Sequence, residues 1–134
     1  MSSLLMAANR LTVACKACAN AYSDDGVAKN NFGDAAKIFL RLWAQEVGLS
    51  KPSIKWNKGG PAVSGEVMLT TDTFEIWITD HVGGNDHSIM YRKRYQINDG
   101  IHNDRWGSGR NMWTSPVKFT KVTLDEMSRL PSDF

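Results

Sequence analysis

Cysteine is scarce in this sequence, and so is net charge. Two cysteines in 134 residues exclude both a disulfide-rich scaffold and a zinc site with four cysteine ligands. The formal net charge of +2 is too small for binding nucleic acid through overall charge, although it permits a local basic surface. Hydrophobic residues make up 42% and charged residues 22%, which is typical of a folded globular protein.

Long apolar runs are also missing. No segment approaches the roughly 20 apolar residues that a transmembrane helix requires. Met1 to Met6 lacks the basic residues that open a signal peptide, and Arg10 interrupts the apolar stretch that would follow. We therefore expect a cytoplasmic protein that does not bind a membrane and whose thiols stay reduced.

Sequence signatures of catalysis are absent too. The glycines at 59–60 and 107–109 do not precede a helix whose N-terminus would hold a phosphate, and no G-x-S-x-G element occurs. We expect a protein that is not an enzyme and carries no cofactor.

The N-terminal third has helical periodicity. An apolar stripe spaced by four and three residues predicts a helix from about Ser3 to Tyr22, and a second stripe predicts another that ends at Gly48 and begins with Asn31 or Asp34 as its cap. The first stripe comprises Leu4, Ala8, Leu11, Cys15, Cys18 and Tyr22, and the second comprises Phe32, Ala35, Ala36, Phe39, Trp43 and Val47.

From Ser53 the period changes to two, which indicates strands. Strands are expected at 53–56, 63–69, 74–78 and 88–97, a short one at the end of 101–114, and a last one beginning at Val117 and Phe119; turns are expected at 57–61 and 98–100. Thr123 and Glu126 form a capping box for a short helix. The sequence thus predicts one α+β domain over residues 1–134, with two N-terminal helices on one face of a roughly five-stranded antiparallel sheet and a short C-terminal helix.

Charge divides the predicted sheet into two regions. Residues 61–88 carry a local charge of −5, and residues 89–121 carry +5. Aromatic residues accompany the basic region, and Trp77 is predicted opposite the apolar face of its strand, where a second layer or a ligand would have to cover it. The candidate binding residues are Trp77, Arg92, Arg94, Trp106, Arg110, Trp113 and Lys118. The alternative is that Arg92 and Arg94 pair across the sheet with Glu66 and Glu75 and that the tryptophans belong to the core, leaving no binding surface.

Two further clusters have structural and functional interpretations. Cys15 and Cys18 form a C-x-x-C pair, but both fall in the middle of a helix on its apolar stripe, which favours buried core thiols over a redox or metal site. The three histidines lie near aspartates between residues 80 and 104, an arrangement that suits a metal-dependent hydrolase or, more simply, a polar loop. The residues of that hydrolase site would be Asp80, His81, Asp86, His87, His102 and Asp104.

Three functions follow from these patterns. The first is a small non-enzymatic module that binds a protein partner, such as the inhibitors and adaptors that phages and mobile elements direct against host defences. The second is nucleic-acid binding through the basic aromatic surface, because exposed rings stack on bases while cations meet phosphates. The third is the metal-dependent hydrolase. The protein is expected to be a monomer, or a homodimer formed at an open sheet edge along 88–97.

Overall fold

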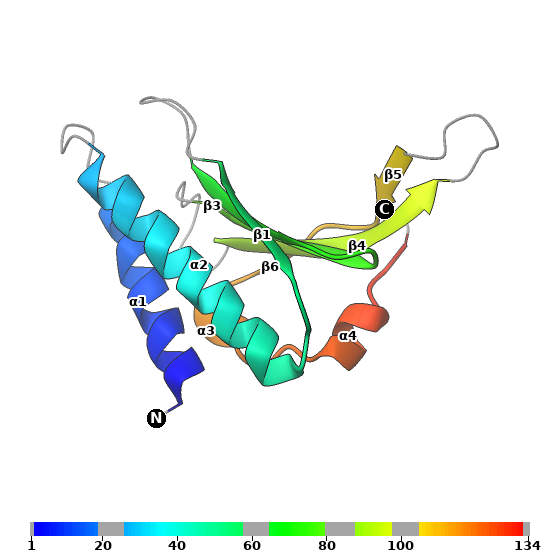
Figure 1. Ribbon diagram of the computed structural model, residues 1–134, viewed down its shortest axis with the longest axis horizontal. Helices are drawn as coiled ribbons and strands as arrows, with labels where there is room; N and C mark the ends of the chain where they lie inside the picture. The colour runs from blue at the N-terminus through cyan, green and yellow to red at the C-terminus, as the bar shows by residue number, and fades with distance from the viewer. Residues whose placement is uncertain (1, 19–25, 58–64, 80–87, 98–104, 133–134) are drawn as a thin grey trace.

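A computed structural model describes residues 2–18, 26–57, 65–79, 88–97 and 105–132 (Figure 1). The N-terminal helices are α1 (Ser3–Cys18) and α2 (Val27–Val47). The strands are β1 (Ser53–Asn57), β2 (Glu66–Thr70), β3 (Phe74–Thr79), β4 (Ile89–Ile97), β5 (Arg105–Ser108) and β6 (Met112–Thr114), followed by α3 (Pro116–Phe119) and α4 (Leu124–Ser128). The predicted α+β class, with two long helices packed against an antiparallel sheet, is confirmed.

The two long helices bury the predicted stripes. In α1, Leu4, Ala8, Leu11 and Cys15 are buried and Cys18 is half-buried; in α2 the stripe from Phe32 to Trp43 is buried and Val47 is half-buried. The predicted cap of α2 was wrong: the helix begins after Gly26, which adopts the left-handed φ of 83° and lies before both Asn31 and Asp34. Gly48 ends it with a φ of 80°, as expected from a C-terminal glycine. No helix among the described residues is long and apolar enough to span a bilayer.

All strand pairs are antiparallel, in the order β1-β2-β3-β4-β5, with β6 also beside β4. Tyr91 pairs with Met112 and Arg94 with Ser108, so residues 92–93 lie opposite residues 109–111 in a β-bulge that separates β5 from β6. The amide of Gly109 still donates to the Lys93 carbonyl at 2.9 Å. Strand β4 therefore lies inside the sheet, and the predicted open edge along 88–97 was wrong.

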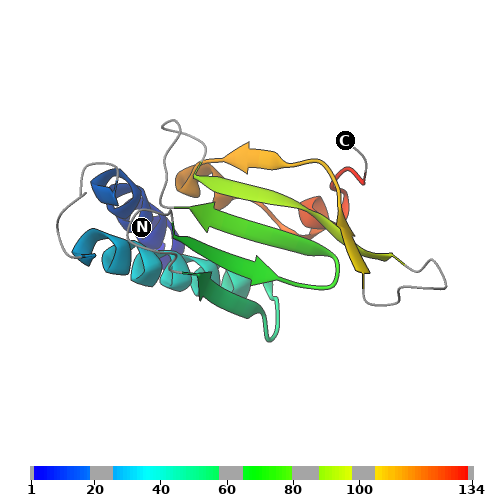
Figure 2. The ribbon, with the colours of Figure 1, turned by 90° about the horizontal axis from the view of Figure 1, so that it is seen from above.

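Strand β4 is longer than its neighbour β3. Their pairing ends at Phe74 and Lys93, and beyond it residues 94–97 pair with β5 in a two-stranded ribbon that extends past the body of the sheet (Figure 2). Gly107 lies directly beneath the Tyr95 ring, where an added Cβ would come within 2.5 Å of ring atoms. This ribbon carries Arg94 and Trp106 beyond the end of β3.

The segment after β6 is helical, so the predicted last strand at Val117 and Phe119 was wrong. The Ser115 hydroxyl accepts a hydrogen bond from the Lys118 amide, and Pro116 occupies the first helical position. Phe119 is fully buried and packs on Trp43 and Tyr91, with ring centroids 5.1 Å and 5.3 Å away. The predicted cap at Thr123 is confirmed: its hydroxyl accepts from the Glu126 amide at 3.2 Å, and the helix ends before Pro131.

Alternation along the strands gives the sheet two faces. The covered face presents Val67, Leu69, Ile76, Ile78 and Ile89 to the helices, and each of these side chains is fully buried. The helices lie on this side of the sheet (Figure 1), and the indole Nε1 of Trp43 donates to the Val122 carbonyl at 3.0 Å. We call the opposite side, which presents Met68, Glu75, Trp77, Met90 and Arg92, the open face.

Tyr22, Val63 and the predicted turn at 98–100 lie outside the described residues. So does the predicted turn at 57–61 apart from Asn57, which is the last residue of β1.

Candidate functional site

A row of side chains crosses the open face from β1 to β6. The strand register places Lys55, Met68, Trp77, Met90 and Trp113 as successive cross-strand neighbours. Met68 and Trp77 are half-buried and Met90 is only 8% exposed, whereas Trp113 at the edge is 52% exposed. The Trp77 indole nitrogen is buried without a hydrogen-bond partner among the described residues. The four apolar side chains of the row, Met68, Trp77, Met90 and Trp113, do not belong to the core that the helices cover.

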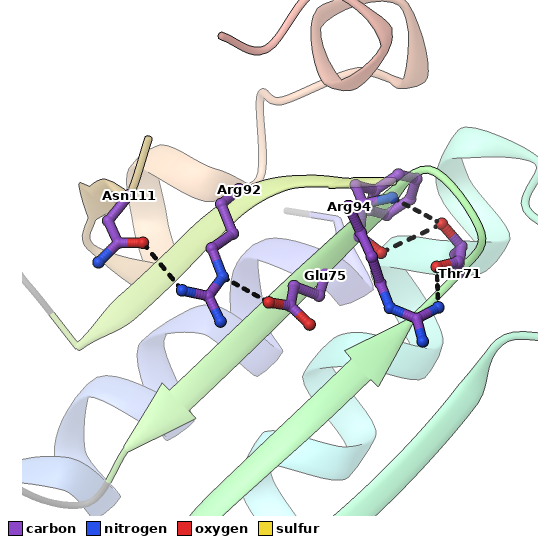
Figure 3. A network of polar contacts seen from close by, with 6 residues as sticks. Thr71, Glu75, Arg92, Arg94 and Asn111 are labelled. Atoms are coloured by element: carbon purple, nitrogen blue, oxygen red, sulfur yellow. Dashed lines mark hydrogen bonds and ion pairs between the residues drawn. The ribbon is translucent and has the colours of Figure 1, made fainter. Parts of the chain in front are cut away.

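A polar group lies beside this row (Figure 3). Arg92 forms an ion pair with Glu75, its cross-strand neighbour, through Nε and Oε1, and its Nη1 donates to Asn111 Oδ1 at 3.2 Å. The two charged side chains are 25% and 12% exposed, so the pair is held largely out of water. The Arg92 guanidinium also lies 5.8 Å from the centroid of Trp77. Arg92 therefore covers part of the apolar row and is neutralised by Glu75.

Arg94, two residues further along β4, has different partners. Its Nη1 donates to the Thr71 carbonyl at 2.9 Å (Figure 3), and its guanidinium stacks on the Trp106 ring, 3.6 Å from the centroid. Trp106 is 40% exposed. Among the described residues, Arg94 has no carboxylate partner. Arg92 is thus held in an ion pair, whereas Arg94 is stacked on Trp106 and bound to a carbonyl, without a carboxylate from the described ranges.

Five of the seven predicted site residues share the open face. These are Trp77, Arg92, Arg94, Trp106 and Trp113. Arg110 is exposed in the bulge at the edge of the sheet, while Lys118 is exposed on α3, in the helical layer. Arg92 and Glu75 form one of the cross-strand ion pairs of the alternative hypothesis. Arg94 does not form the other, because it binds the Thr71 carbonyl instead of Glu66.

Sequence reasoning did not include Met68, Met90, Thr71 or Asn111 among the site residues. Alternation places Met68 opposite the core positions of its strand, which was the available signal for its facing outward. The row itself depends on the register of four strand pairs, which no local pattern encodes. Asn111 reaches Arg92 only because the bulge brings it opposite β4.

On the covered face, Tyr91 has a raised pKa. Burial under α3 and α4 is the larger cause, and the negative charge of Glu126 is the smaller one. Both disfavour the phenolate, so the hydroxyl stays protonated above the pH at which an exposed tyrosine ionises.

The thiols of α1 give no metal or disulfide site within the described residues, and the histidines lie outside them. Cys15 is buried in α1, and it and Cys18 are not joined in a disulfide. The residues of the hydrolase hypothesis, at 80–87 and 102–104, lie outside the described residues. Within the part of the chain that the structure describes, no group of three His, Cys, Asp or Glu side chains is arranged to hold a metal ion.

Comparison of this chain with known protein families, with curated proteins and with solved structures finds no match.

Proposed function

We propose that this protein is a non-enzymatic module that binds a protein partner on the open face of its sheet. The observation that supports this most is the row Met68, Trp77, Met90 and Trp113, which no described helix covers and which ends in a half-exposed tryptophan. Apolar surface of this kind beside arginines is typical of protein interfaces, where Trp and Arg dominate the binding energy.

A protein partner suits this face better than nucleic acid does. Arg92 is already neutralised by Glu75, whose carboxylate would repel a phosphate backbone laid across the strands. Two of the four apolar side chains of the row are methionines, which adapt to apolar protein surfaces and offer nothing to phosphates. The alternative of nucleic-acid binding depends on Trp106 and Arg94, and it is tested below with an oligonucleotide.

Within this proposal, the protein acts by binding to its partner. The row and the ion pair beside it are built on paired strands, so the surface is formed before binding and little order must be gained on contact. An inhibitor or adaptor, such as those that phages and mobile elements use against host defences, works in this way. Membrane binding, a cofactor and catalysis are not part of the proposal.

The test is photocross-linking in living cells of the natural host. A photoreactive phenylalanine analogue replaces Trp113 in one variant and Val13 in another; Val13 is 68% exposed on α1, in the helical layer. We expect a discrete protein adduct from position 113 that position 13 does not give. Adducts identical at the two positions, or none at position 113, would contradict the proposal.

A second measurement uses the captured protein itself. Trp113→Ala is expected to weaken binding of the captured protein at least about tenfold. A tryptophan that is a hot spot of an interface commonly contributes 2 kcal/mol or more, which corresponds to about thirtyfold in affinity. Val13→Ala is the matched control and should leave the affinity unchanged. Equal effects of the two variants would place the interface elsewhere.

A further inference from the structure

We infer that the partner presents an acidic segment, with one carboxylate bound to Arg94 and a bulky apolar side chain on the exposed Trp113, beside Met90. This inference rests on the proposed function and specifies the chemistry of the partner. It follows from the charge of this end of the sheet, from the partners of Arg94, and from the distance between Arg94 and the apolar row.

Positive charge predominates at this end of the sheet: residues 89–121 carry a net charge of +5, with Asp99 and Asp104 counted. Every charged side chain in the described residues from 88 to 97 and from 105 to 121 is a lysine or an arginine. These are Arg92, Lys93, Arg94, Arg105, Arg110, Lys118 and Lys121. Of these, Arg92 is neutralised by Glu75 from β3, and Arg105 also has an interaction partner, so the carboxylate is assigned to Arg94. A negatively charged partner is complementary to this end of the molecule and would be attracted to it from a distance.

Arg94 is held in place before any partner arrives. Its backbone amide donates to the Thr73 carbonyl at 2.9 Å, its Nη1 donates to the Thr71 carbonyl at 2.9 Å, and its guanidinium lies flat on Trp106. A guanidinium has five N–H donors, so the remaining donors of Arg94 are available in a fixed plane. A carboxylate accepts two such donors at once. Arg94 is therefore oriented for a carboxylate that its own chain does not supply from the described residues.

The distance between Arg94 and the apolar row predicts how far apart the acidic and the apolar residue lie in the partner. Arg94 and Met90 lie on the same face of β4, four residues apart, which corresponds to about 13 Å along a strand. An extended segment would match this distance with an aspartate or glutamate about four residues from a large apolar residue. Trp113, the cross-strand neighbour of Met90, widens the apolar end of this site.

A discrete carboxylate fits better than a chain of phosphates. Glu75 lies between the two ends of the site on the open face, and Asp72 is exposed in the turn that also supplies Thr71 to Arg94. A polyanion following the sheet would meet both acidic side chains, whereas a single carboxylate at Arg94 need not. The observations thus favour an acidic protein segment over nucleic acid.

The experiment is a selection of random peptides displayed on phage against three purified proteins: the unmodified protein, Arg94→Gln, and Arg41→Gln. Arg41 is exposed on α2, so its variant loses the same charge on the other side of the sheet. We expect the unmodified protein and Arg41→Gln to enrich peptides that combine an acidic residue with a bulky apolar one, and Arg94→Gln to lose the acidic preference. The best peptide should bind Arg94→Gln at least about tenfold more weakly, since a hydrogen bond to a charged group contributes about 1.5–3 kcal/mol.

Three results would overturn the inference. The first is enrichment of apolar peptides without acidic residues, which would leave the proposed function standing. The second is an acidic preference that Arg94→Gln retains. The third is tighter binding of a polythymidine oligonucleotide than of any selected peptide, with loss of that binding in Arg94→Gln. Failure to enrich any peptide whose binding Trp113→Ala weakens would contradict both this inference and the proposed function. Thermal unfolding of Arg94→Gln and Arg94→Lys, compared with the unmodified protein, verifies that lost binding does not reflect lost folding.

Discussion

The two faces of the sheet are built from the same strands, yet they are protected from water in different ways. On the covered face, Leu69 and Ile76 are fully buried beneath helices. On the open face, their strand neighbours Met68 and Trp77 are half-buried, and a guanidinium lies over the indole. The comparison shows that apolar residues on both faces of a strand need not mean two layers of core. Side chains of the sheet itself, with one arginine, shield the second face only in part.

The largest expected difference between the faces concerns two tryptophans. Trp43 is fully buried, packs edge-on against Phe74 and bonds Val122, whereas Trp113 is 52% exposed. Trp43→Ala should lower the free energy of unfolding by about 3–5 kcal/mol because it leaves a large cavity. Trp113→Ala should lower it by less than about 1 kcal/mol. Urea unfolding of both variants measures the two values.

Comparable losses from the two tryptophans would mean that the open face is as important to stability as the core. The proposed docking role of Trp113 would then lose its basis, because an exposed side chain that stabilises the fold needs no partner to explain it.

The next prediction concerns the packing of β1 on α2. Gly33 faces the Trp56 ring, and an added Cβ would lie 2.5 Å from Cε2 and Cζ2 of the indole and 2.7 Å from Cη2. Replacing a glycine inside a helix with alanine normally stabilises it by about 0.5–1 kcal/mol. Gly33→Ala should instead destabilise the protein by about 1–3 kcal/mol, because the tryptophan must move in a packed core. Urea denaturation tests the sign.

The control for this prediction is Trp56→Leu, which removes the ring that the new methyl group meets. In that background Gly33→Ala should become neutral or stabilising. Destabilisation of equal size in both backgrounds would show that the ring is not the cause.

On the open face, the expected loss of stability is of similar size and depends on a pair of charged side chains. Glu75→Ala leaves the half-buried Arg92 without its carboxylate and should lower stability by about 1–3 kcal/mol. The double variant Glu75→Ala, Arg92→Ala should lose less than the sum of the two single variants, since no charge is left uncompensated. Chemical denaturation of all four proteins gives the coupling energy, and strict additivity would mean that the ion pair contributes nothing.

The smallest expected effect is a loss of stability at alkaline pH that depends on Tyr91, on the covered face. The pKa of Tyr91 is raised by burial and by Glu126, so the folded state holds this proton more tightly than the unfolded state. Stability should therefore fall as the pH rises above about 10, the ordinary pKa at which the unfolded tyrosine ionises. Tyr91→Phe should flatten this fall, whereas Tyr95→Phe, on the more exposed ribbon, serves as the control. Unfolding curves across that pH range compare them; an unchanged slope in Tyr91→Phe would refute the assignment.

Sequence periodicity predicted much of this fold because each element carries a local signal. Leu4 to Cys15 and Phe32 to Trp43 repeat at helical spacing, Gly48 ends α2, and Thr123 caps α4. The error at Val117 and Phe119 arose from their alternation, which outweighed the serine and proline that begin α3. The start of α2 was missed because Gly26, a residue without a capping side chain, precedes it.

The candidate surface was harder to predict than the elements that carry it. Spacing of two residues correctly put Arg92 and Arg94 on one face of β4. This spacing contained no information on the partners of the two arginines. Strand register brings Glu75 to Arg92, and the ribbon beyond β3 brings Trp106 to Arg94. Lys118 was included through proximity in sequence, and a helix carries it to the other layer.

The bond from Trp43 to Val122 joins positions 79 residues apart, and Phe119 and Met127 complete the same core. During synthesis on the ribosome, α1 and α2 emerge well before this segment. Their apolar stripe then remains accessible to chaperones and proteases until residues 119–127 have left the exit tunnel. A nascent chain interrupted before that point lacks the side chains that close the interior, so premature termination should yield products destined for degradation.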